Sequence, residues 1–205
     1  MAFIEKAKHV LYSKAIQIIA GVVVIGAMVG AGAWVYIQKT TPEFYDPDTH
    51  VSFRYSNKLV GQRAYDEKDK QDKIIYRLKN GEKISEPILV TVKYENGLRK
   101  VSSVLRYDIV DILLDNADKL FAKQYIKYAK ESERKFTTDS GNKAAELTFS
   151  YLSPLGYFIK SRMVIVMRDE DEAIYVSAQT GQKTFDATNK HYFEKIFTSI
   201  DFKNL

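Results

Sequence analysis

The stretch that decides the fold is YFIKSRMVIVMRDEDEAIYVSAQTGQKTFDATNKHYFEKIFTSIDF, residues 157–202. Its segment from Met163 to Met167 is apolar at every position, which predicts a central strand covered on both faces. From Ile174 to Ala178, apolar and polar residues alternate, which predicts a second strand. The acidic run from Asp169 to Glu172 separates the two strands and predicts a charged hairpin tip that discourages edge-to-edge aggregation.

The second half of the same stretch has helical spacing. Between Phe185 and Ile200, apolar residues recur every three or four positions, which predicts one helix. The apolar stripe of this helix comprises Tyr192, Phe193, Ile196 and Phe197. We expect the stripe to pack on the sheet.

Towards the N-terminus, further strands are predicted at Val51–Tyr55, Lys73–Leu78, Ile88–Tyr94 and Ala145–Tyr151, the last with the alternation of a half-buried strand. A second helical pattern covers residues 109–121. Asn80-Gly81 and Asn96-Gly97 predict two-residue hairpin turns. The sequence therefore predicts an α+β fold, in which helices pack on the faces of a mostly antiparallel β-sheet.

The end of the chain resembles the PsbP/Mog-like superfamily. Two long strands precede a helix that closes in the pattern F-x-x-I-F-x-S-I-x-F, formed here by Phe193, Ile196, Phe197, Ser199, Ile200 and Phe202. The segment FYDPDTHVSFRYSNKL, Phe44 to Leu59, is similar to the aromatic-rich start of the same superfamily. The resemblance covers nearly all of residues 44–202, but its motifs consist mostly of core residues. Ser56-Asn57 stands where members usually have a proline.

The resemblance implies a PsbP-like α/β sandwich and a largely non-enzymatic role. Members include accessory subunits of the photosynthetic oxygen-evolving complex, a Ran-binding nuclear factor and bacterial envelope proteins. They share no active site, so the resemblance carries no catalytic residue over to this chain. It identifies the chain as a membrane-anchored bacterial relative.

A second fold also accommodates an anchored α+β domain. In type IV secretion systems, the cone-shaped scaffold domain follows a single membrane span and is exported. That domain starts with helices and ends on strands, whereas strands come first and a helix last in the pattern predicted here. This order argues against the cone-shaped scaffold.

Composition excludes several classes of protein. The 205 residues contain 45% apolar residues and no cysteine, which excludes a disordered chain, a disulfide scaffold and thiolate chemistry. The net charge is +5, and residues 1–39, with four Lys and one Glu, account for three of those charges. The remaining 166 residues carry only +2, so nucleic acid is not a predicted partner.

A transmembrane helix is predicted at residues 15–38, because no charged residue interrupts the run between Lys14 and Lys39. Its 24 residues would extend roughly 36 Å as a helix, which exceeds a hydrocarbon core of about 30 Å. Lysines dominate before the span and acidic residues follow it, so we expect residues 1–14 to form a cytoplasmic tip. Residues 39–43 are a predicted linker, and residues 44–205 a predicted extracytoplasmic domain of a cell-membrane protein.

Two further features of this span concern its cleavage and its contact with other membrane helices. Ala31-Gly32-Ala33 matches a signal-peptidase site, but the apolar run continues past it through Trp34 and Tyr36, which favours an uncleaved anchor. Gly26-x-x-x-Gly30 has the spacing that lets membrane helices approach closely, although small residues are also common in such helices. Gly26 and Gly30 are therefore candidate helix-pairing residues and a route to an oligomer.

Metal-binding patterns in the sequence are weak. Asp46, Asp48 and His50 form an Asp-x-Asp-x-His cluster, for which an exposed turn is the simpler interpretation. His191 and Glu194 are three residues apart on a predicted helix and could share a metal ion. The simpler interpretation is that both are polar residues on the helix surface. The acidic run at 169–172 lacks the ligand spacing of a calcium loop. No nucleophile motif, phosphate loop or dinucleotide fingerprint occurs, so no catalytic, cofactor-binding or metal residue is predicted.

A basic spacing follows the middle helix. Lys119, Lys123, Lys127 and Lys130 recur with Tyr125 and Tyr128 between them. This arrangement suits an anionic wall polymer or lipid headgroups, but a solvated face is the simpler interpretation.

These features predict a single-pass, non-enzymatic accessory protein that presents a PsbP-like domain to a membrane or envelope partner. The alternative is a structural subunit of an envelope or secretion assembly.

Overall fold

The computed structural model describes residues 41–64, 67–81, 87–98 and 108–203. Those from Pro42 onwards belong to one unit of the chain. The predicted cytoplasmic tip, the span at 15–38 and the candidate pairing residues Gly26 and Gly30 lie outside the described residues. Among the residues that are described, no helix is both long enough and apolar enough to cross a membrane.

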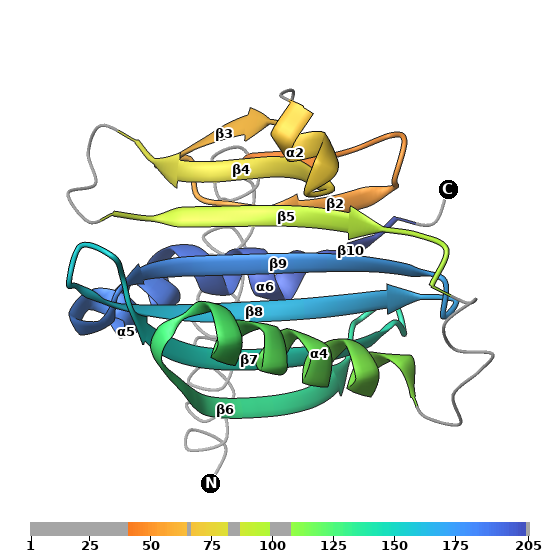
Figure 1. Ribbon diagram of the computed structural model, residues 1–205. Coiled ribbons are helices and arrows are strands. Elements are labelled where there is room, and N and C mark those ends of the chain that lie inside the picture. The colour runs from red at the N-terminus through yellow and green to blue at the C-terminus, as the bar shows by residue number, and fades with distance from the viewer. Residues whose placement is uncertain (1–40, 65–66, 82–86, 99–107, 204–205) are drawn as a thin grey trace, which may run out of the picture. The chain divides into compact units, whose positions relative to one another are not determined.

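A seven-stranded antiparallel sheet forms the centre of the domain, as Figure 1 shows. Its spatial order is β3 (Leu59–Arg63), β4 (Ile74–Asn80), β5 (Leu89–Glu95), β9 (Glu172–Gly181), β8 (Phe158–Arg168), β7 (Lys143–Leu152) and β6 (Ile126–Thr137). Val164, Ile165 and Val166 of β8 are fully buried, which confirms the central strand predicted from their uninterrupted apolar run. The charged run after Met167 forms the β8–β9 hairpin tip, as predicted.

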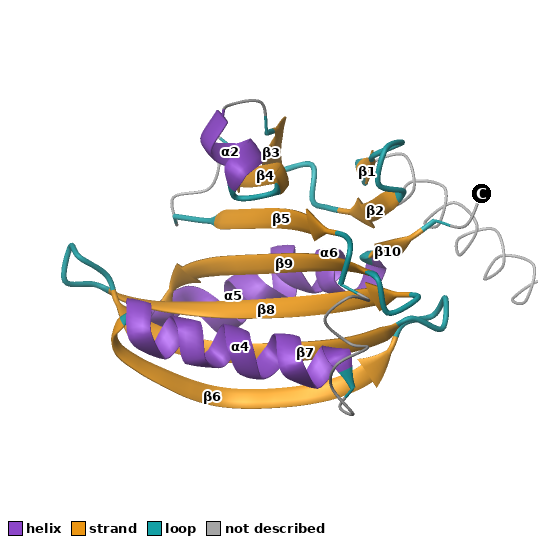
Figure 2. Ribbon diagram, turned by 45° about the vertical axis from the view of Figure 1, so that its right-hand side comes forward, coloured by secondary structure: helices purple, strands orange, loops and turns teal. Residues whose placement is uncertain are grey.

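A smaller sheet places β2 (Val51–Arg54) between β1 (Glu43–Tyr45) and β10 (Asp201–Phe202), visible in Figure 2. The sequence pattern did not predict β10, because two residues are too short to show a period. Phe202 instead becomes strand-like by pairing with Val51, 151 positions earlier in the chain. This pairing fixes the C-terminal end of the domain beside its first strands.

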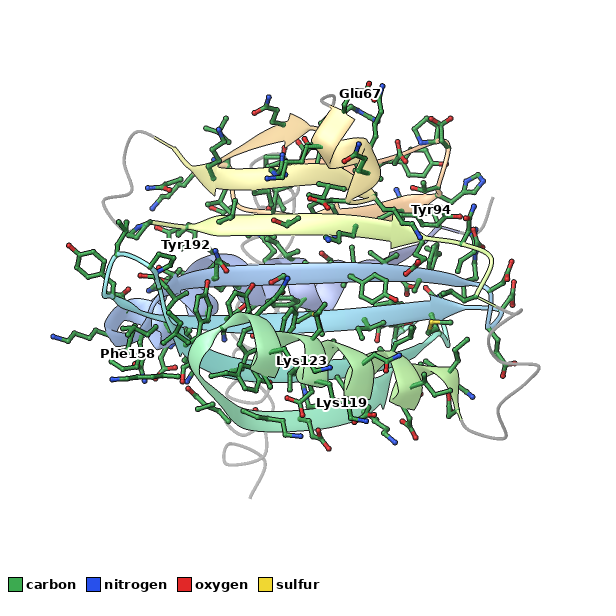
Figure 3. All side chains as sticks on the ribbon, viewed as in Figure 1. Glu67, Tyr94, Lys119, Lys123, Phe158 and Tyr192 are labelled. Carbon is green, nitrogen blue, oxygen red and sulfur yellow. The ribbon has the colours of Figure 1, made fainter. Side chains whose placement is uncertain are left out.

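Helix α4 (Ile109–Gln124) covers one face of the large sheet, as predicted for residues 109–121. Asp108 caps its N-terminus by accepting a hydrogen bond from the Val110 N–H. The buried face of α4 packs on Leu147, Phe149 and Ile165 in a shared apolar cluster. Lys119 and Lys123 lie on the outer side of the helix, where Figure 3 labels them.

The opposite face is covered by the C-terminal helical segment. It runs through a 3-10 turn (Gln182–Thr184), α5 (Phe185–Thr188), a π-helical turn (Asn189–Phe193) and α6 (Glu194–Ser199). A regular α-helix would turn Phe193 about 80° away from Phe185, since residues eight apart do not align at 3.6 residues per turn. The π-helical turn contains about one residue more than an α-helical turn, so both rings point into the core. Phe185 is 4% exposed there, and Phe193 is 0% exposed. The single helix predicted for Phe185–Ile200 is therefore interrupted, but its apolar stripe packs on the sheet as expected.

Two local predictions were wrong, and one short helix was not predicted. Asn80-Gly81 is not a two-residue hairpin turn, because Lys79 pairs with Leu89 and leaves a longer connection between β4 and β5. Asn96-Gly97 is not a hairpin turn either, because β5 pairs with β9 across the sheet. The short helix α2 (Glu67–Gln71), which contains four charged residues, was not predicted. In contrast, Gly141 and Gly156 have positive φ angles in the β6–β7 and β7–β8 turns.

Strand β7 differs from the predicted half-buried strand in one respect that matters for function. Its apolar residues face α4, but Glu146, Thr148 and Ser150 on the other side are also at most 9% exposed. They are buried because the C-terminal helical segment and β6 enclose that face. A carboxylate in the interior needs partners, and those partners define the candidate site.

Candidate functional site: a groove beside a buried arginine

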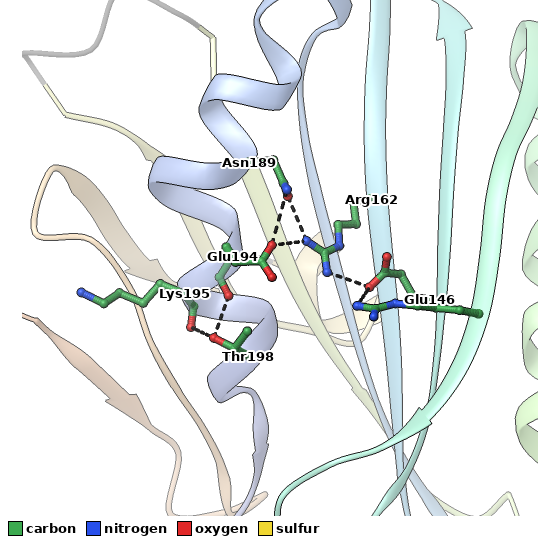
Figure 4. A network of polar contacts seen from close by, with 7 residues as sticks. Glu146, Arg162, Asn189, Glu194, Lys195 and Thr198 are labelled. Atoms are coloured by element: carbon green, nitrogen blue, oxygen red, sulfur yellow. Dashed lines mark hydrogen bonds and ion pairs between the residues drawn. The ribbon is translucent and has the colours of Figure 1, made fainter.

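Arg162 lies at the middle of the candidate site. It projects from β8 towards the C-terminal helical segment, and its side chain is only 7% exposed. Its Nη2 donates to Glu146 Oε2 at 2.7 Å, and its Nη1 donates to Glu194 Oε2 at 2.7 Å and to Asn189 Oδ1 at 3.0 Å (Figure 4). The arginine thus links β7, β8 and α6 through charge-assisted hydrogen bonds.

Glu146 is shared between two arginines. Its Oε2 also accepts a hydrogen bond from Arg134 Nη2 of the edge strand β6 at 2.9 Å. Burial alone raises the pKa of Glu146, but the hydrogen bonds from Arg134 and Arg162 outweigh it and hold this pKa below its usual range. Glu146 is therefore ionised at neutral pH and holds the edge strand to the centre of the sheet.

Aromatic rings complete the surroundings of both guanidinium groups. The Arg162 guanidinium carbon lies 4.5 Å from the centre of the Phe197 ring, and that of Arg134 lies 5.2 Å from the Phe136 ring. Planar guanidinium groups stack on aromatic faces in this way. Phe136 of β6, Phe197 of α6 and the guanidinium-bearing residues Arg134 and Arg162 all line one opening.

The opening is a groove of about 800 Å³ between β6, α6, β2 and β10. Its apolar lining comes from Phe53, Phe136, Phe197, Ile200 and Phe202. Its rim carries both charge signs, with Arg54, Arg134 and Lys203 facing Glu43, Asp139 and Asp201. Lys203 binds Glu43 at 2.6 Å, and Asn142 donates to Asp201 at 2.6 Å, whereas the Arg54 side chain has no ion-pair partner in the described part of the chain. An apolar floor inside a charged rim is the usual anatomy of a protein-binding surface.

Two residues of the Asp-x-Asp-x-His cluster, Asp46 and His50, have structural partners, whereas Asp48 is exposed. Asp46 is buried, binds Arg63 at 2.8 Å and accepts a hydrogen bond from Thr49 at 2.6 Å. His50 has a positive φ of 59°, and its Nδ1 lies 3.2 Å from the Tyr45 hydroxyl. Within the described ranges no group of three or more potential metal ligands is present. The cluster lies at the β1–β2 turn, but this turn is not fully exposed as expected, because Asp46 is only 5% exposed.

The other two acidic or histidine patterns are also explained by contacts. Glu194 turns inwards to Arg162, while His191 lies in the π-helical turn, so the expected regular helical spacing of the two is not present. In the β8–β9 tip, Glu172 binds Arg168 at 2.6 Å and accepts a hydrogen bond from the Tyr94 hydroxyl. Neither pattern gathers ligands around a common centre.

The basic spacing separates into two groups. Lys119 binds Asp115 at 2.6 Å, and Lys130 binds Asp118 at 2.9 Å, so these two lysines are neutralised. Lys123 and Lys127 make no ion pair with the described part of the chain. The interleaved Tyr125 and Tyr128 turn towards the α4 core, and Tyr125 stacks on Tyr151 at 4.1 Å between ring centres.

The resolved pKa shifts in the described part of the chain follow from ion pairing and burial. Every resolved pKa shift in the described part of the chain moves away from neutrality. Carboxylates such as Glu146 are lowered, cations such as Arg134 are raised, and burial raises the pKa of Tyr151 to about 12. These groups therefore serve ion pairs and packing.

Sequence reasoning missed the Arg162–Glu146 pair, although a signal was present. Arg162 precedes the uninterrupted apolar run of β8, and Glu146 sits inside the alternating run of β7. Two opposite charges inside neighbouring strands predict a cross-strand ion pair if the strands are adjacent and the face is covered. The alternation of residues 145–151 predicts only a half-buried strand, so the sequence did not reveal that the second face, which carries Glu146, was covered.

Comparisons with solved structures agree with this architecture. The chain is similar to PsbP (CyanoP) from Synechocystis sp. PCC 6803, with 10% identity, a TM-score of 0.50 and coverage of 80% of this chain and 93% of that chain. It is also similar to the Ran-binding protein Mog1p from Saccharomyces cerevisiae, with 9% identity, a TM-score of 0.52 and coverage of 79% and 95%. No protein-family model and no curated protein matches the sequence.

These likenesses show the fold alone, because the identities are low. The predicted mostly antiparallel α+β architecture is confirmed, and the domain has a PsbP/Mog-like fold. The described order begins with strands β1 to β3, which is opposite to the order expected for a cone-shaped scaffold domain.

The pKa of Glu146 gives a testable pH dependence. A carboxyl group with a lowered folded-state pKa contributes stability that is present above its unfolded pKa of about 4.5 and is lost as pH falls through the folded value. We expect the wild-type chain to lose stability below about pH 4.5 more steeply than Glu146→Gln, which is less stable at neutral pH. Urea unfolding of both proteins in mild detergent, at neutral pH and at successively lower pH, measures the difference. Parallel pH profiles would contradict this assignment.

Proposed function

We propose that the chain is a non-enzymatic accessory protein of the cell membrane. One helix over residues 15–38 anchors it, and the PsbP/Mog-like domain binds a protein partner outside the cytoplasm. The groove between β6 and α6 is the binding surface, and its apolar floor with a rim of both charge signs is the observation that carries the proposal. The partner accordingly presents an apolar side chain flanked by charges of both signs.

Two further observations support a protein partner. The yeast structural neighbour is a Ran-binding protein, so one protein with this fold binds another protein. The walls of the groove are held by the Arg162–Glu146–Arg134 network and need little rearrangement on binding, which lowers the entropic cost of association. Turnover of a substrate by the purified full chain would contradict the non-enzymatic part of the proposal.

Site-specific photo-cross-linking tests the groove. The full chain is made in its native membrane with a photoreactive residue in place of Arg54, at the groove rim, or of Val60, which is 58% exposed on the far edge strand β3. We expect one discrete cross-linked species from position 54 and none from position 60. Exchanging Arg54 for Glu should lower partner recovery about tenfold, as for an interface arginine of moderate importance. Equal labelling from both positions would remove the groove as the binding surface.

The anchor and its orientation rest on the sequence. The uncharged run between Lys14 and Lys39 and the preceding lysines support one span with a cytoplasmic N-terminus. The anchored chain should stay in the membrane pellet after alkaline carbonate treatment, and protease added outside the cell membrane should digest the domain. A mature N-terminus near Trp34 would show instead that a signal peptide is removed.

A structural subunit of an envelope assembly is the second candidate function. The observation that favours it is Gly26-x-x-x-Gly30, whose small residues allow close contact between membrane helices. Changing Gly26 and Gly30 to Leu should lower the oligomer size of the detergent-solubilised full chain, measured by light scattering. An Ala27→Leu change provides a control within the same span. An unchanged oligomer after the double glycine change would remove this role.

A further inference from the structure

Four exposed apolar side chains gather at one end of the large sheet. Ile126 at the start of β6 is 60% exposed, Phe158 at the start of β8 is 46% exposed, and Leu155 and Tyr157 in the β7–β8 turn are 82% and 68% exposed. The strand register places them together, because Ile126 pairs with Leu152 and Leu152 pairs with Phe158. We call these four residues the tip patch. Figure 3 labels Phe158 at this end of the sheet.

The turn that carries the tip patch is well ordered by its own hydrogen bonds. The Ser153 N–H donates to the Tyr157 carbonyl at 2.8 Å, and the Gly156 N–H donates to the Ser153 carbonyl at 2.9 Å. Gly156 supplies the positive φ of 82° that the turn requires. The apolar side chains are therefore displayed outwards by a defined hairpin.

The segments that carry the tip patch contain lysines. The segments 120–128 and 152–160 contain Lys123, Lys127 and Lys160 and no acidic residue. The Lys127 ammonium lies 5.9 Å from the centre of the Phe158 ring, while Lys160 binds Glu131 at 2.8 Å. Lys127 is thus an available cation beside exposed apolar surface, and Lys123 lies three positions before Ile126 in the chain. Lys160 is offset by Glu131 and by Asp186, whose carboxylate lies 3.8 Å from its ammonium.

The opposite end of the same strands has the opposite charge. Strand β8 runs from Phe158 to Arg168, and the β8–β9 tip that follows reads Asp169-Glu170-Asp171-Glu172. Figure 1 shows the β7–β8 and β8–β9 turns at opposite ends of the sheet. An anionic surface would therefore attract the end with the tip patch and repel the other end, which orients the domain.

We propose that the tip patch docks on the surface of a bilayer containing anionic lipids. This inference rests on the proposed function, which tethers the domain to a membrane. Aromatic and aliphatic side chains flanked by lysines suit the boundary between headgroups and acyl chains, where apolar groups insert and cations meet phosphate. A convex hairpin with four apolar residues is small for a specific protein interface of about 800 Å² per partner, which favours lipid over a second protein.

A single environment-sensitive dye tests the docking. The chain has no cysteine, so Tyr157→Cys or Val60→Cys provides one labelling site each, at the tip patch and on the far edge strand. The labelled full chain is reconstituted in vesicles of phosphatidylcholine alone or with about one third phosphatidylglycerol. We expect a blue-shifted, brighter dye at position 157 only with phosphatidylglycerol, a weaker response at high salt, and no response at position 60.

Charge reversal provides the matched comparison. Lys123→Glu with Lys127→Glu, in the Tyr157→Cys background, should lower the docked-to-free ratio at least about twenty-five-fold, since each lysine near an anionic surface contributes about fivefold. Lys58→Glu with Lys79→Glu makes the same charge change beside β3 and should leave the dye response unchanged. Equal responses in neutral and anionic vesicles would overturn the proposal. A dye response that grows with protein concentration without lipid would assign the patch to a second copy of the chain and also overturn it.

Two outcomes separate this inference from the membrane tether. A chain that washes off vesicles in alkaline carbonate, but whose dye still responds to added anionic vesicles, would contradict the tether and retain the docking. A chain that resists carbonate, with a dye that does not distinguish the two lipid mixtures, would retain the tether and overturn the docking.

Discussion

Replacing Arg162 by Met is expected to lower the free energy of unfolding by about 3 kcal/mol, the lower end of the range for breaking a buried ion pair. The change leaves Glu146 in the interior with only Arg134, whose side chain is 58% exposed and held less firmly. The Glu194 side chain is 47% exposed, so its carboxylate can be hydrated when Arg162 is absent. This hydration limits the loss of stability. Urea unfolding of the full chain in mild detergent, followed by near-ultraviolet circular dichroism of its tyrosines, measures the effect.

The Arg162 prediction is sharpened by a double-mutant cycle. Combining Arg162→Met with Glu146→Met removes both buried charges and should recover most of the lost stability, because well-packed apolar residues substitute for a buried ion pair at little cost. Arg134→Met alone should cost no more than about 1 kcal/mol, as expected for an exposed partner. Purely additive single effects would show that Arg162 and Glu146 do not act as a pair.

Replacing Phe149 by Ala is expected to cost about 3–5 kcal/mol, the range for removing a buried aromatic ring. The Phe149 ring is 1% exposed on β7 and lies 4.7 Å from Phe121 and 5.4 Å from Tyr128, measured between ring centres. Its loss therefore opens a cavity between the sheet and α4, and α4 should lose protection from hydrogen exchange before the central strands do.

Phe158→Ala is the matched control for this prediction. It removes the same ring at a position 46% exposed, so its cost should stay below about 1 kcal/mol. Phe149→Leu should cost less than Phe149→Ala because it leaves a smaller cavity. Similar losses at positions 149 and 158 would mean that the α4 interface does not depend on this ring.

Much of the architecture could be predicted from local patterns. The apolar run from Met163 to Met167 indicated the central strand, and the spacing of residues 109–121 indicated α4. The acidic run at 169–172 indicated a hairpin tip. Each of these signals depends on one segment's own periodicity or turn chemistry, which the chain carries wherever that segment lies. The span at 15–38 is a prediction of the same kind, and it stays a prediction.

The candidate site could not be predicted in this way, because its parts meet only through long-range packing. The groove joins β2 to α6 and β10, which are far apart in sequence, and the ion pairs join Glu146 to Glu194 through Arg162. Asn96-Gly97 has the composition of a hairpin turn, yet β5 pairs with β9 across the sheet. Local composition does not record which strand becomes a neighbour.

The sequence by itself determined strands β2, β4, β5, β7, β8 and β9, the α4 helix and the near-neutral charge of the domain, since these follow from the composition and residue order of the chain. Only the tertiary structure decided that the polar face of β7 would be covered. Once the C-terminal helical segment packed there, Glu146 and Arg162 lost their water and had to pair with each other. The same packing turned Phe136 and Phe197 towards one groove, and it is that covered face that gives the domain a candidate binding surface.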